Sequence, residues 1–409
     1  MQEPLYNTNQ RTEKLVESNN RIDYEDLLNS EIDTKSAKVN NIVCKSTNSE
    51  PGNIQKQLYQ FKRGLTSFQP YLDTLNIGPE FKHYYILEAF SVFPNLKNLN
   101  ISCNIIPLSP LSKVLNQLTY LESLNLSSNY FIIFNNDEEG SDIQINLPTS
   151  LKSLHISDCI LLAGETSETS MPLDYSSLRT TFHDYFNLPP QHLPNLKNFT
   201  YRNINREAAP IVSEFLELNP TITYLSTHTG SFSHPTARIL EHCQNLQHLS
   251  LESDFSNIEH LARFRIPELP NITSIKFNYT YKDEFLFLAN LCLNCPNLTD
   301  LELNYKPYCK GMINSLLSQL SGLKSLTLTN DCIQGFQLDL STLPELEQIK
   351  VDVRSVDYID LKKFENSKKL RNITLIPRLQ KSNVKHNLED KFNNWSIINY
   401  VGKVQCYKN

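Results

Sequence analysis

Glycine is scarce in this sequence, and long apolar runs are missing. Only 10 of the 409 residues are glycine, about 2.4% where roughly 7% is usual, so glycine-rich loops that cradle phosphate groups are nearly excluded. No stretch approaches the roughly 18 uninterrupted apolar residues of a membrane span. The first residues, Met-Gln-Glu-Pro-Leu-Tyr, have neither the basic start nor the apolar run of a secretory signal.

An excess of positive charge is missing too. The chain has 38 lysines and arginines against 44 aspartates and glutamates, a net charge of -6, so we expect neither a nucleic acid nor a membrane as a partner. The nine cysteines are odd in number and spread without regular pairing, which is typical of reduced thiols. We therefore expect a cytoplasmic or nuclear protein without disulfides.

The common catalytic signatures are absent as well. The sequence contains no nucleotide-binding P-loop, no His-Glu-x-x-His, no Gly-x-Ser-x-Gly and no kinase signature. The Cys-x-x-Cys pair Cys292 and Cys295 has no second pair to complete a zinc site, so we expect it to pack in the core. We therefore expect no enzyme activity, no cofactor and no metal site.

One phrase recurs from about residue 70 onward. It consists of an apolar residue, two variable residues, an apolar residue, one variable residue and an apolar residue, in several copies after Leu-Pro-Asn or Cys-Pro-Asn. Successive copies are mostly 23 to 26 residues apart, with longer gaps of 30 and 45 residues. The phrase predicts a short strand with one apolar face, which a unit this small buries only between stacked neighbours. Its twelve copies begin at Leu72, Leu96, Leu121, Leu151, Leu196, Ile222, Leu246, Ile272, Leu298, Leu323, Leu346 and Leu370.

Over residues 70–376 the chain resembles leucine-rich-repeat proteins, whose pattern this phrase matches. The resemblance implies an α/β fold: a horseshoe-shaped solenoid of about twelve repeats, with a parallel inner sheet and a mostly helical convex side. Helical spacing of apolar residues in connecting segments such as 208–218 and 285–295 agrees with this architecture.

Both ends of the repeat region are expected to be capped. Apolar residues at helical spacing predict a short N-terminal helical cap over residues 53–69. Residues 377–409 are expected to form a C-terminal cap, in which 386–401 are a helix with Trp395 in its apolar stripe.

The 45-residue gap between two copies of the phrase leaves two alternatives for residues 160–190. The polar run Gly164 to Ser170 favours a loop insertion that leaves the repeat series. The other alternative is a degenerate thirteenth repeat near Leu173 to Leu178.

The polar N-terminal region, residues 1–52, contains a second resemblance. Within residues 21–45, Ile32-Asp33-Thr34-Lys35-Ser36 and Ile42-Val43-Cys44-Lys45 are similar to the end of an F-box. The family's opening Leu-Pro is replaced by Ile22-Asp23, and about three apolar residues of its first helix are missing. The alternative is a polar extension. The resemblance implies that a ligase adaptor would be contacted by Leu27, Leu28, Ile32, Ile42 and Val43.

Strand geometry predicts where the repeats bind a partner. Side chains that flank the second apolar position point away from the core, onto the concave face. Larger and charged side chains gather in the middle of that face, and tyrosine and arginine are frequent at binding hot spots. Histidines 155, 228 and 248 suggest a contact sensitive to pH between about 6 and 7. The candidate partner-binding residues are Arg202, Tyr224, His228, His248, Glu252, Lys276, Asp300 and Glu302.

These features favour a non-catalytic protein-interaction module. The F-box resemblance implies the substrate-recognition subunit of an SCF-type (cullin-RING) ubiquitin ligase, with adaptor and cullin subunits held through the N-terminus. The alternative is a leucine-rich-repeat scaffold, or a regulator of a GTPase or a phosphatase, with no link to a ligase.

Overall fold

The computed structural model divides into two compact units. Unit 1 comprises Met1–Pro148 and Ile160–Asp184, and unit 2 comprises Thr149–Cys159 and Tyr185–Asn409. The division therefore runs through the predicted repeat region.

The residues that the structure describes are 59, 62–66, 68–69, 72–78, 87, 90, 92–134, 145–164, 180–203, 208–232, 234–253, 265–278, 282–304, 309–329, 340–353, 364, 367–377, 395–400 and 402–408.

The described residues include only part of the predicted N-terminal cap, in which 62–66 are helical. Residues 1–52, with the F-box-like segment and all five predicted adaptor contacts, lie outside them. Among the described helices, none has both the length and the apolar character needed to cross a membrane.

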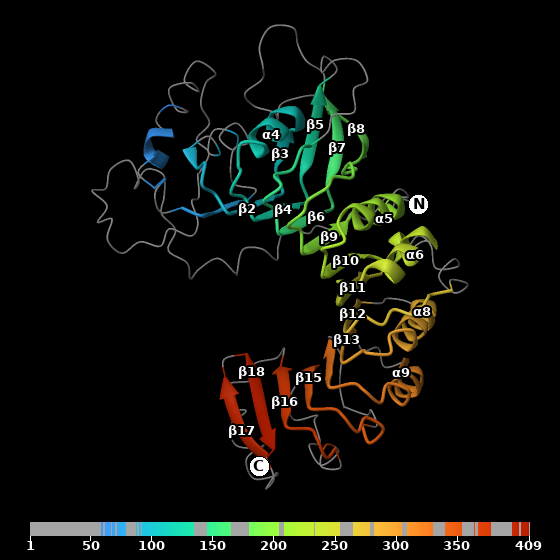
Figure 1. Ribbon diagram of the computed structural model, residues 1–409. Helices are drawn as coiled ribbons and strands as arrows, with labels where there is room; N and C mark the ends of the chain where they lie inside the picture. Colours follow the sequence, from blue (N-terminus) through green and yellow to red (C-terminus); the bar gives the residue numbers. More distant parts are fainter. Residues whose placement is uncertain are drawn as a thin grey trace, which may run out of the picture. The chain divides into compact units, whose positions relative to one another are not determined.

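Unit 1 contains strands from two sheets (Figure 1). The first set, in the order β1-β2-β4, consists of parallel strands whose paired residues are 24 or 25 positions apart, such as Leu75 with Leu99 and Leu99 with Leu124. The alternate apolar side chains of these strands are buried. The strands are β1 (Thr74–Ile77), β2 (Asn98–Ser102) and β4 (Ser123–Ser127).

The second sheet of unit 1 has the order β3-β5-β7-β8. The pairs β3–β5 and β5–β7 are parallel, and the helix α4 (Leu108–Leu115) directly follows β3. The connecting segments here therefore contain strands as well as a helix. The sequence predicted a mostly helical convex side and did not predict these strands. The strands are β3 (Ile105–Pro107), β5 (Tyr130–Phe134), β7 (Ile160–Gly164) and β8 (Thr180–Tyr185).

The strands β7 and β8 also correct the predicted loop insertion over residues 160–190. Residues 160–164 and 180–185 of that range are strands, and the alternative repeat near Leu173 to Leu178 lies outside the described residues. The side chains of Ile132 and Phe134 form an apolar cluster at this sheet. A Cβ atom on Gly164 would lie 2.8 Å from Cγ2 of Ile132, so this glycine allows β7 to pack closely against that cluster.

The sheet of unit 2 has the order β6-β9-β10-β11-β12-β13-β14-β15-β16-β18-β17. From β6 to β16 each strand pairs in parallel with the next. Paired residues occupy the same position of successive repeats, as in Leu225 with Leu249 and Leu301 with Leu326. These strands are β6 (Ser153–Ser157), β9 (Asn198–Arg202), β10 (Tyr224–His228), β11 (His248–Glu252), β12 (Ser274–Asn278), β13 (Asp300–Asn304), β14 (Ser325–Thr329), β15 (Gln348–Val353) and β16 (Asn372–Pro377).

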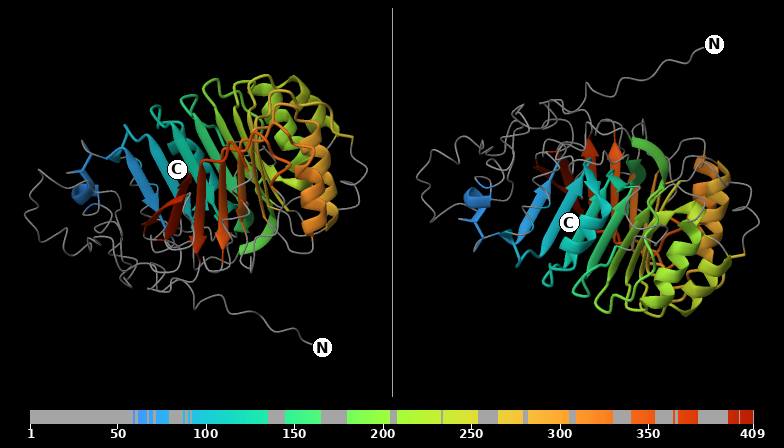
Figure 2. Two further views of the ribbon diagram at one scale, coloured as in Figure 1. Left: turned by 90° about the horizontal axis from the view of Figure 1, so that it is seen from below. Right: turned by 90° about the horizontal axis from the view of Figure 1, so that it is seen from above.

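Helices lie along one side of this sheet, which we call the outer side (Figures 1 and 2). Their apolar side chains, such as Phe215 and Leu288, are buried together with the apolar side chains of the strands. The opposite face of the sheet, here called the inner face, carries the side chains of alternate strand residues. The helices are α5 (Ala208–Leu218), α6 (His234–His242), α8 (Lys282–Leu293) and α9 (Lys310–Leu317), and the short 3-10 turn η4 is Thr229–Ser231.

The C-terminal residues form a β-hairpin on the last parallel strand, so the predicted helix over 386–401 is wrong for its described part. The strand β17 (Trp395–Tyr400) pairs antiparallel with β18 (Lys403–Lys408), which pairs antiparallel with β16. Trp395 and Ile397 face the same side as buried Cys406, while Ile398 and Tyr400 face the other side. Apolar residues on both faces of a strand can imitate helical spacing.

Asparagines in the turns explain part of the recurring phrase. The side-chain amide of Asn195, at the third position of Leu-Pro-Asn, donates a hydrogen bond to the carbonyl of Thr149 at 3.0 Å. The equivalent Asn245 and Asn297 donate to the carbonyls of the preceding repeats at 2.9 and 2.8 Å. Because buried or turn carbonyls need a donor, each of these asparagines ties its own turn to the turn before it.

A second set of asparagines follows the strands. In unit 1, Nδ2 of Asn129 donates to the carbonyl of Ile101 (2.8 Å), and its Oδ1 accepts from the backbone N–H of Asn104 (3.0 Å). In unit 2, Oδ1 of Asn203 accepts from the N–H of Cys159 (3.0 Å). These buried amides replace the ladder hydrogen bonds that the backbone loses where a strand ends.

Candidate partner-binding surface

The parallel register arranges the inner-face side chains of unit 2 in rows. Equivalent residues of neighbouring repeats are about 4.8 Å apart across the strands, so a long side chain in one repeat can reach the next repeat or the one after it. From β9 to β13 the first row is Asn198, Tyr224, His248, Ser274 and Asp300; the second is Thr200, Ser226, Ser250, Lys276 and Glu302; the third is Arg202, His228, Glu252, Asn278 and Asn304.

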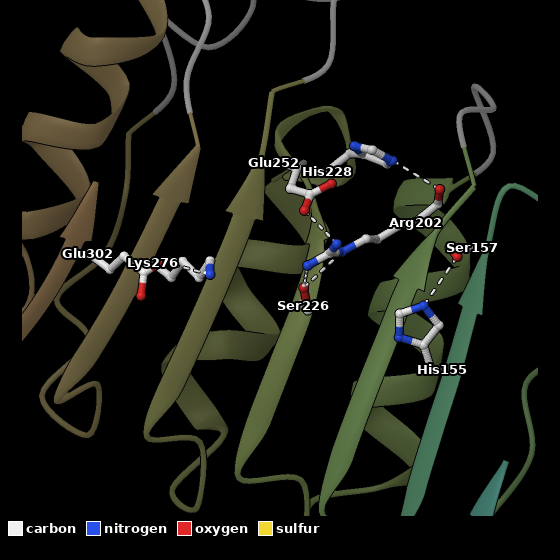
Figure 3. Close-up of polar contacts among 8 residues, drawn as sticks. All are labelled: His155, Ser157, Arg202, Ser226, His228, Glu252, Lys276 and Glu302. Carbon is white, nitrogen blue, oxygen red and sulfur yellow. Dashed lines mark hydrogen bonds and ion pairs between the residues drawn. The ribbon is translucent and has the colours of Figure 1, made fainter. Parts of the chain in front are cut away.

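Arg202 joins three strands of this face (Figure 3). Its guanidinium donates hydrogen bonds from Nε and Nη2 to Oγ of Ser226, at 3.1 and 2.8 Å, and its Nη1 lies 2.5 Å from Oε1 of Glu252. The side chains of Arg202 and Glu252 are 23% and 32% exposed. This partly buried pair holds the arginine across β10, pointing from β9 toward β11.

His228, the last residue of β10, also contacts this group. Its Nε2 lies 2.9 Å from the backbone carbonyl of Arg202, and because a carbonyl only accepts, Nε2 carries the proton and donates. His228 is 8% exposed, and Nδ1 has no hydrogen-bond partner within the described part of the chain. Oγ of Ser250, a residue 1% exposed, is likewise buried without a described partner.

A second ion pair lies on the next two strands. Nζ of Lys276 is 2.7 Å from Oε1 of Glu302, and the two side chains are 51% and 33% exposed. The hydroxyl of Thr299 donates to Oδ2 of Asp300 at 2.7 Å. Farther along the sheet, burial raises the pKa of Asp352, Glu302 adds to the increase and Lys350 opposes it.

Five of the eight predicted candidates therefore form two contacting groups. Arg202, His228 and Glu252 contact one another, and Lys276 contacts Glu302. The other three lie on the inner face without a contact to these groups in the described residues: Tyr224 is half-buried, His248 is exposed and Asp300 is half-buried.

The sequence suggests His155 only as a pH-sensitive contact, but its surroundings disfavour a change of charge near neutral pH. Its Nε2 lies 3.1 Å from Oγ of Ser157. Burial lowers the pKa of His155 below its ordinary value of 6.5, and the positive charge of Arg202 lowers it further, against opposing effects of Asp158 and Glu252. The ring is therefore neutral at pH 7.

Sequence reasoning missed the buried hydroxyls beneath the arginine. Ser226 and Ser250 are both almost fully buried on the inner face, although small polar residues there are expected to be solvated. The signal was present in the rows, because Arg202 of β9 and Glu252 of β11 occupy the same row, and the small Ser226 of the strand between them lies in the neighbouring row.

Several of the described cysteines are buried, and burial affects their chemistry. Burial raises the pKa of Cys295 to about 12 and that of Cys243 to about 11, and raises the pKa of Cys292 as well, with the neighbouring Cys295 adding to it. Thiols with raised pKa values are poor nucleophiles and poor metal ligands. In the described ranges, no three His, Cys, Asp or Glu residues are grouped closely enough to hold a metal ion.

Parallel strands in register at intervals of 23 to 26 residues, each with a buried apolar face, define the fold of unit 2 as a leucine-rich-repeat solenoid. No protein-family model matches the chain, and no curated protein matches it in sequence. Among solved structures, the chain is similar to an internalin from Listeria monocytogenes str. 4b F2365. The match has 17% identity and a TM-score of 0.33, and covers 78% of this chain and 92% of the internalin chain.

Proposed function

We propose that this chain is a non-catalytic protein-binding module and that the inner face of unit 2, from β9 to β13, holds its partner. The arrangement of Arg202 supports this proposal most strongly. Its guanidinium is fixed by Ser226 and Glu252 while remaining 23% exposed, so a partner meets an arginine whose position is already set. Pre-organised arginines lose little side-chain entropy on binding.

Two side chains on the neighbouring strands extend the proposed surface. Tyr224 and His248 are paired neighbours in the first row, and neither is used by the Arg202 group. Tyrosine and arginine are the residue types that most often dominate binding energy. The surface offers an aromatic ring, a fixed cation and the carboxylates of Asp300 and Glu302 within five adjacent strands.

The test is affinity purification of the full chain from cell extract with quantitative mass spectrometry. The triple variant Arg202→Ala, Tyr224→Ala, Glu302→Ala is expected to lose a protein that the unmodified chain retains. The matched control is Arg238→Ala, Tyr120→Ala, Glu241→Ala, which removes the same residue types from exposed positions outside the inner face. Equal capture by both triple variants would argue against this surface.

A second variant separates binding from stability. Tyr224→Ala with His248→Ala breaks no hydrogen bond within the described part of the chain, so its unfolding temperature is expected to match that of the unmodified chain. Loss of the same partner from this variant assigns the effect to the surface. Full retention of the partner restricts the contact to the Arg202 and Glu302 groups.

We further propose that the module is the substrate-recognition subunit of an SCF-type ubiquitin ligase. The support is the similarity of residues 32–36 and 42–45 to the end of an F-box, next to a leucine-rich-repeat solenoid. In that arrangement the N-terminal module holds the adaptor and cullin, and the inner face presents a target protein. The alternative is a scaffold, or a regulator of a GTPase or a phosphatase, that uses the same inner face.

Substitution within the full chain distinguishes these functions. If the F-box resemblance is functional, adaptor and cullin subunits copurify with the unmodified chain and are lost from the variant Leu27→Ala, Leu28→Ala, Ile42→Ala, Val43→Ala. If the inner-face partner is retained and no ligase subunit is found with either chain, the scaffold or regulator is favoured.

We also propose a cytoplasmic or nuclear location, which the odd number of scattered cysteines supports. Microscopy of the full chain carrying a fluorescent tag tests it, and a signal confined to the secretory compartments would contradict it.

A further inference from the structure

The C-terminal hairpin extends the inner face of unit 2 beyond its last parallel strand. Asn372 and Thr374 of β16 are paired with Tyr407 and Gln405 of β18, so these side chains share the inner face. Ile398 is paired with Gln405, and therefore lies on the same side. The opposite side carries Ile373, Leu375, Val404 and Cys406, all of which are buried.

Apolar side chains at this end of the inner face are exposed to solvent. Ile398 is 44% exposed, Tyr400 48% and Tyr407 36%. Leu375 pairs with Val404, so the next residue of β16, half-buried Ile376, lies beside Lys403. Ile376 is therefore at the edge of these exposed side chains. We call Ile376, Ile398, Tyr400, Lys403 and Tyr407 the hairpin patch.

Two contacts hold the polar groups of the hairpin patch in place. The hydroxyl of Tyr407 donates to Oε1 of Gln405 at 3.1 Å. Nζ of Lys403 lies 4.9 Å from the centre of the Tyr400 ring. An ammonium group has three N–H donors, and a contact with one aromatic ring does not use all of them, so the lysine can still bind an acceptor supplied from outside.

The charge of Lys403 sets this end apart from the middle of the inner face. Arg202 and Lys276 are each bound to a glutamate, whereas Lys403 contacts no carboxylate in the described ranges. Across β15 to β18 the inner face has the cations Lys350 and Lys403 against one anion, Asp352. A chain with a net charge of -6 thus has a locally positive, aromatic surface here.

We propose that the hairpin patch is a second protein-docking site, which binds a partner segment carrying an apolar or aromatic side chain next to a carboxylate. The apolar side chain packs on Ile398 and Tyr400, and the carboxylate accepts hydrogen bonds from Lys403. Exposed tyrosines contribute strongly to affinity when a partner excludes water from them. This site uses no residue of the Arg202 group, so it does not depend on the function proposed above.

Fluorescence anisotropy with the full chain and three labelled synthetic peptides tests this site. The first peptide contains Phe and Leu flanked by Glu, the second has Lys in place of each Glu, and the third has Ala in place of Phe and Leu. Saturable binding is expected for the first peptide only. No saturable binding of that peptide up to about 1 mM, or equal binding of the lysine peptide, overturns the proposal.

Variants of the full chain assign the binding to the hairpin patch. Tyr400→Ala and Lys403→Glu are each expected to weaken binding of the acidic apolar peptide by about tenfold or more, whereas Tyr400→Phe keeps the ring and retains most of the affinity. Tyr120→Ala removes a tyrosine that is 61% exposed elsewhere and is the matched control. Unchanged affinity in Tyr400→Ala overturns the proposal.

The triple variant of the central surface separates the two sites. Arg202→Ala, Tyr224→Ala, Glu302→Ala is expected to bind the acidic apolar peptide as the unmodified chain does. If this variant alone loses the peptide, the acidic segment binds the central surface, and the hairpin patch is not its site. A competition experiment tests whether the chain itself supplies the occupant, because residues 23–33 carry five acidic residues. If a synthetic peptide of residues 23–33 displaces the acidic apolar peptide, a segment of the chain itself can occupy the hairpin patch. That result overturns the proposal that a partner protein is the occupant.

Discussion

The middle of the inner face and its C-terminal end use the same sheet in opposite ways. Between β9 and β11, polar side chains cover one another: Arg202 reaches Ser226 and Glu252, and His228 bonds to the backbone of Arg202. On β17 and β18, Ile398, Tyr400 and Tyr407 remain exposed, and Lys403 lies on an aromatic ring without a described carboxylate partner.

The difference follows from the direction of the strands. In a parallel series each row has neighbours on both sides at the same height, so a long polar side chain finds a partner one or two repeats away. The hairpin ends the series, and β17 has only β18 as its described neighbour. Polar groups in the middle are thus held in fixed positions by one another, whereas apolar side chains at the end are left exposed.

The largest expected effect is on stability in the middle of the face. Arg202→Ala removes two hydrogen bonds to Ser226 and leaves Glu252 partly buried without its cation, so the free energy of unfolding should fall by about 2 kcal/mol. The matched change Lys276→Ala breaks a more exposed ion pair and should cost less than about 1 kcal/mol. Urea unfolding at one salt concentration measures both, and equal losses would show that burial does not distinguish the two pairs.

A smaller effect is expected in local opening of the two regions. Cys406 is a buried residue of the hairpin strand β18, and Cys295 is a buried residue that follows α8 within the repeat series. The hairpin can separate from β16 alone, whereas exposure of Cys295 requires neighbouring repeats to part, so we expect alkylation of Cys406 to be about tenfold faster. Mass spectrometry of the native chain treated with iodoacetamide measures both rates. Faster modification of Cys295 would mean that the end of the sheet is the firmer region.

The hairpin patch should contribute little to stability. Tyr400 is 48% exposed, so Tyr400→Ala should change the free energy of unfolding by no more than about 0.5 kcal/mol, even though it weakens peptide binding. The same urea experiment provides the value. A loss as large as that of Arg202→Ala would make the tyrosine a structural residue and would remove the contrast between the two regions.

The smallest effect concerns pH. Because the pKa of His155 is lowered in the folded chain, the unfolded chain binds more protons below about pH 6.5, and stability should fall as the pH is lowered through that value toward the folded pKa. His155→Gln should remove this part of the slope without affecting the hairpin. Unfolding temperatures at about pH 7.5 and pH 5.5 test it; identical slopes in both chains would exclude His155 as the source.

The sequence predicted the inner strands well because their signal is repeated. Apolar positions such as Leu249 and Leu301 recur at a fixed interval and are buried at the same depth in each repeat, so each copy supports the assignment of the others. The helical spacing of residues 208–218 coincides with α5. Both features depend on local periodicity, which a single sequence displays directly.

Features that occur once were predicted poorly. Residues 130–134, Tyr-Phe-Ile-Ile-Phe, are a run of apolar residues whose spacing does not distinguish a strand from a buried loop or helix. The spacing of Trp395 and Ile398 fits a helix, yet the strand β17 uses both of its faces. The candidate site was predicted as a set of positions, but the contact from Arg202 to Glu252 depends on which rotamers reach across two strands.

The reversal of direction at β18 also limits how such a chain can lengthen. A repeat duplicated between β9 and β16 would gain a parallel neighbour on each side. Where it carries a turn asparagine, that side chain could bond to the preceding turn as Asn245 and Asn297 do. A repeat appended after β16 would instead have to displace the antiparallel strand that occupies that edge. Growth by internal duplication keeps the hairpin as the last element, and with it any partner that the hairpin binds.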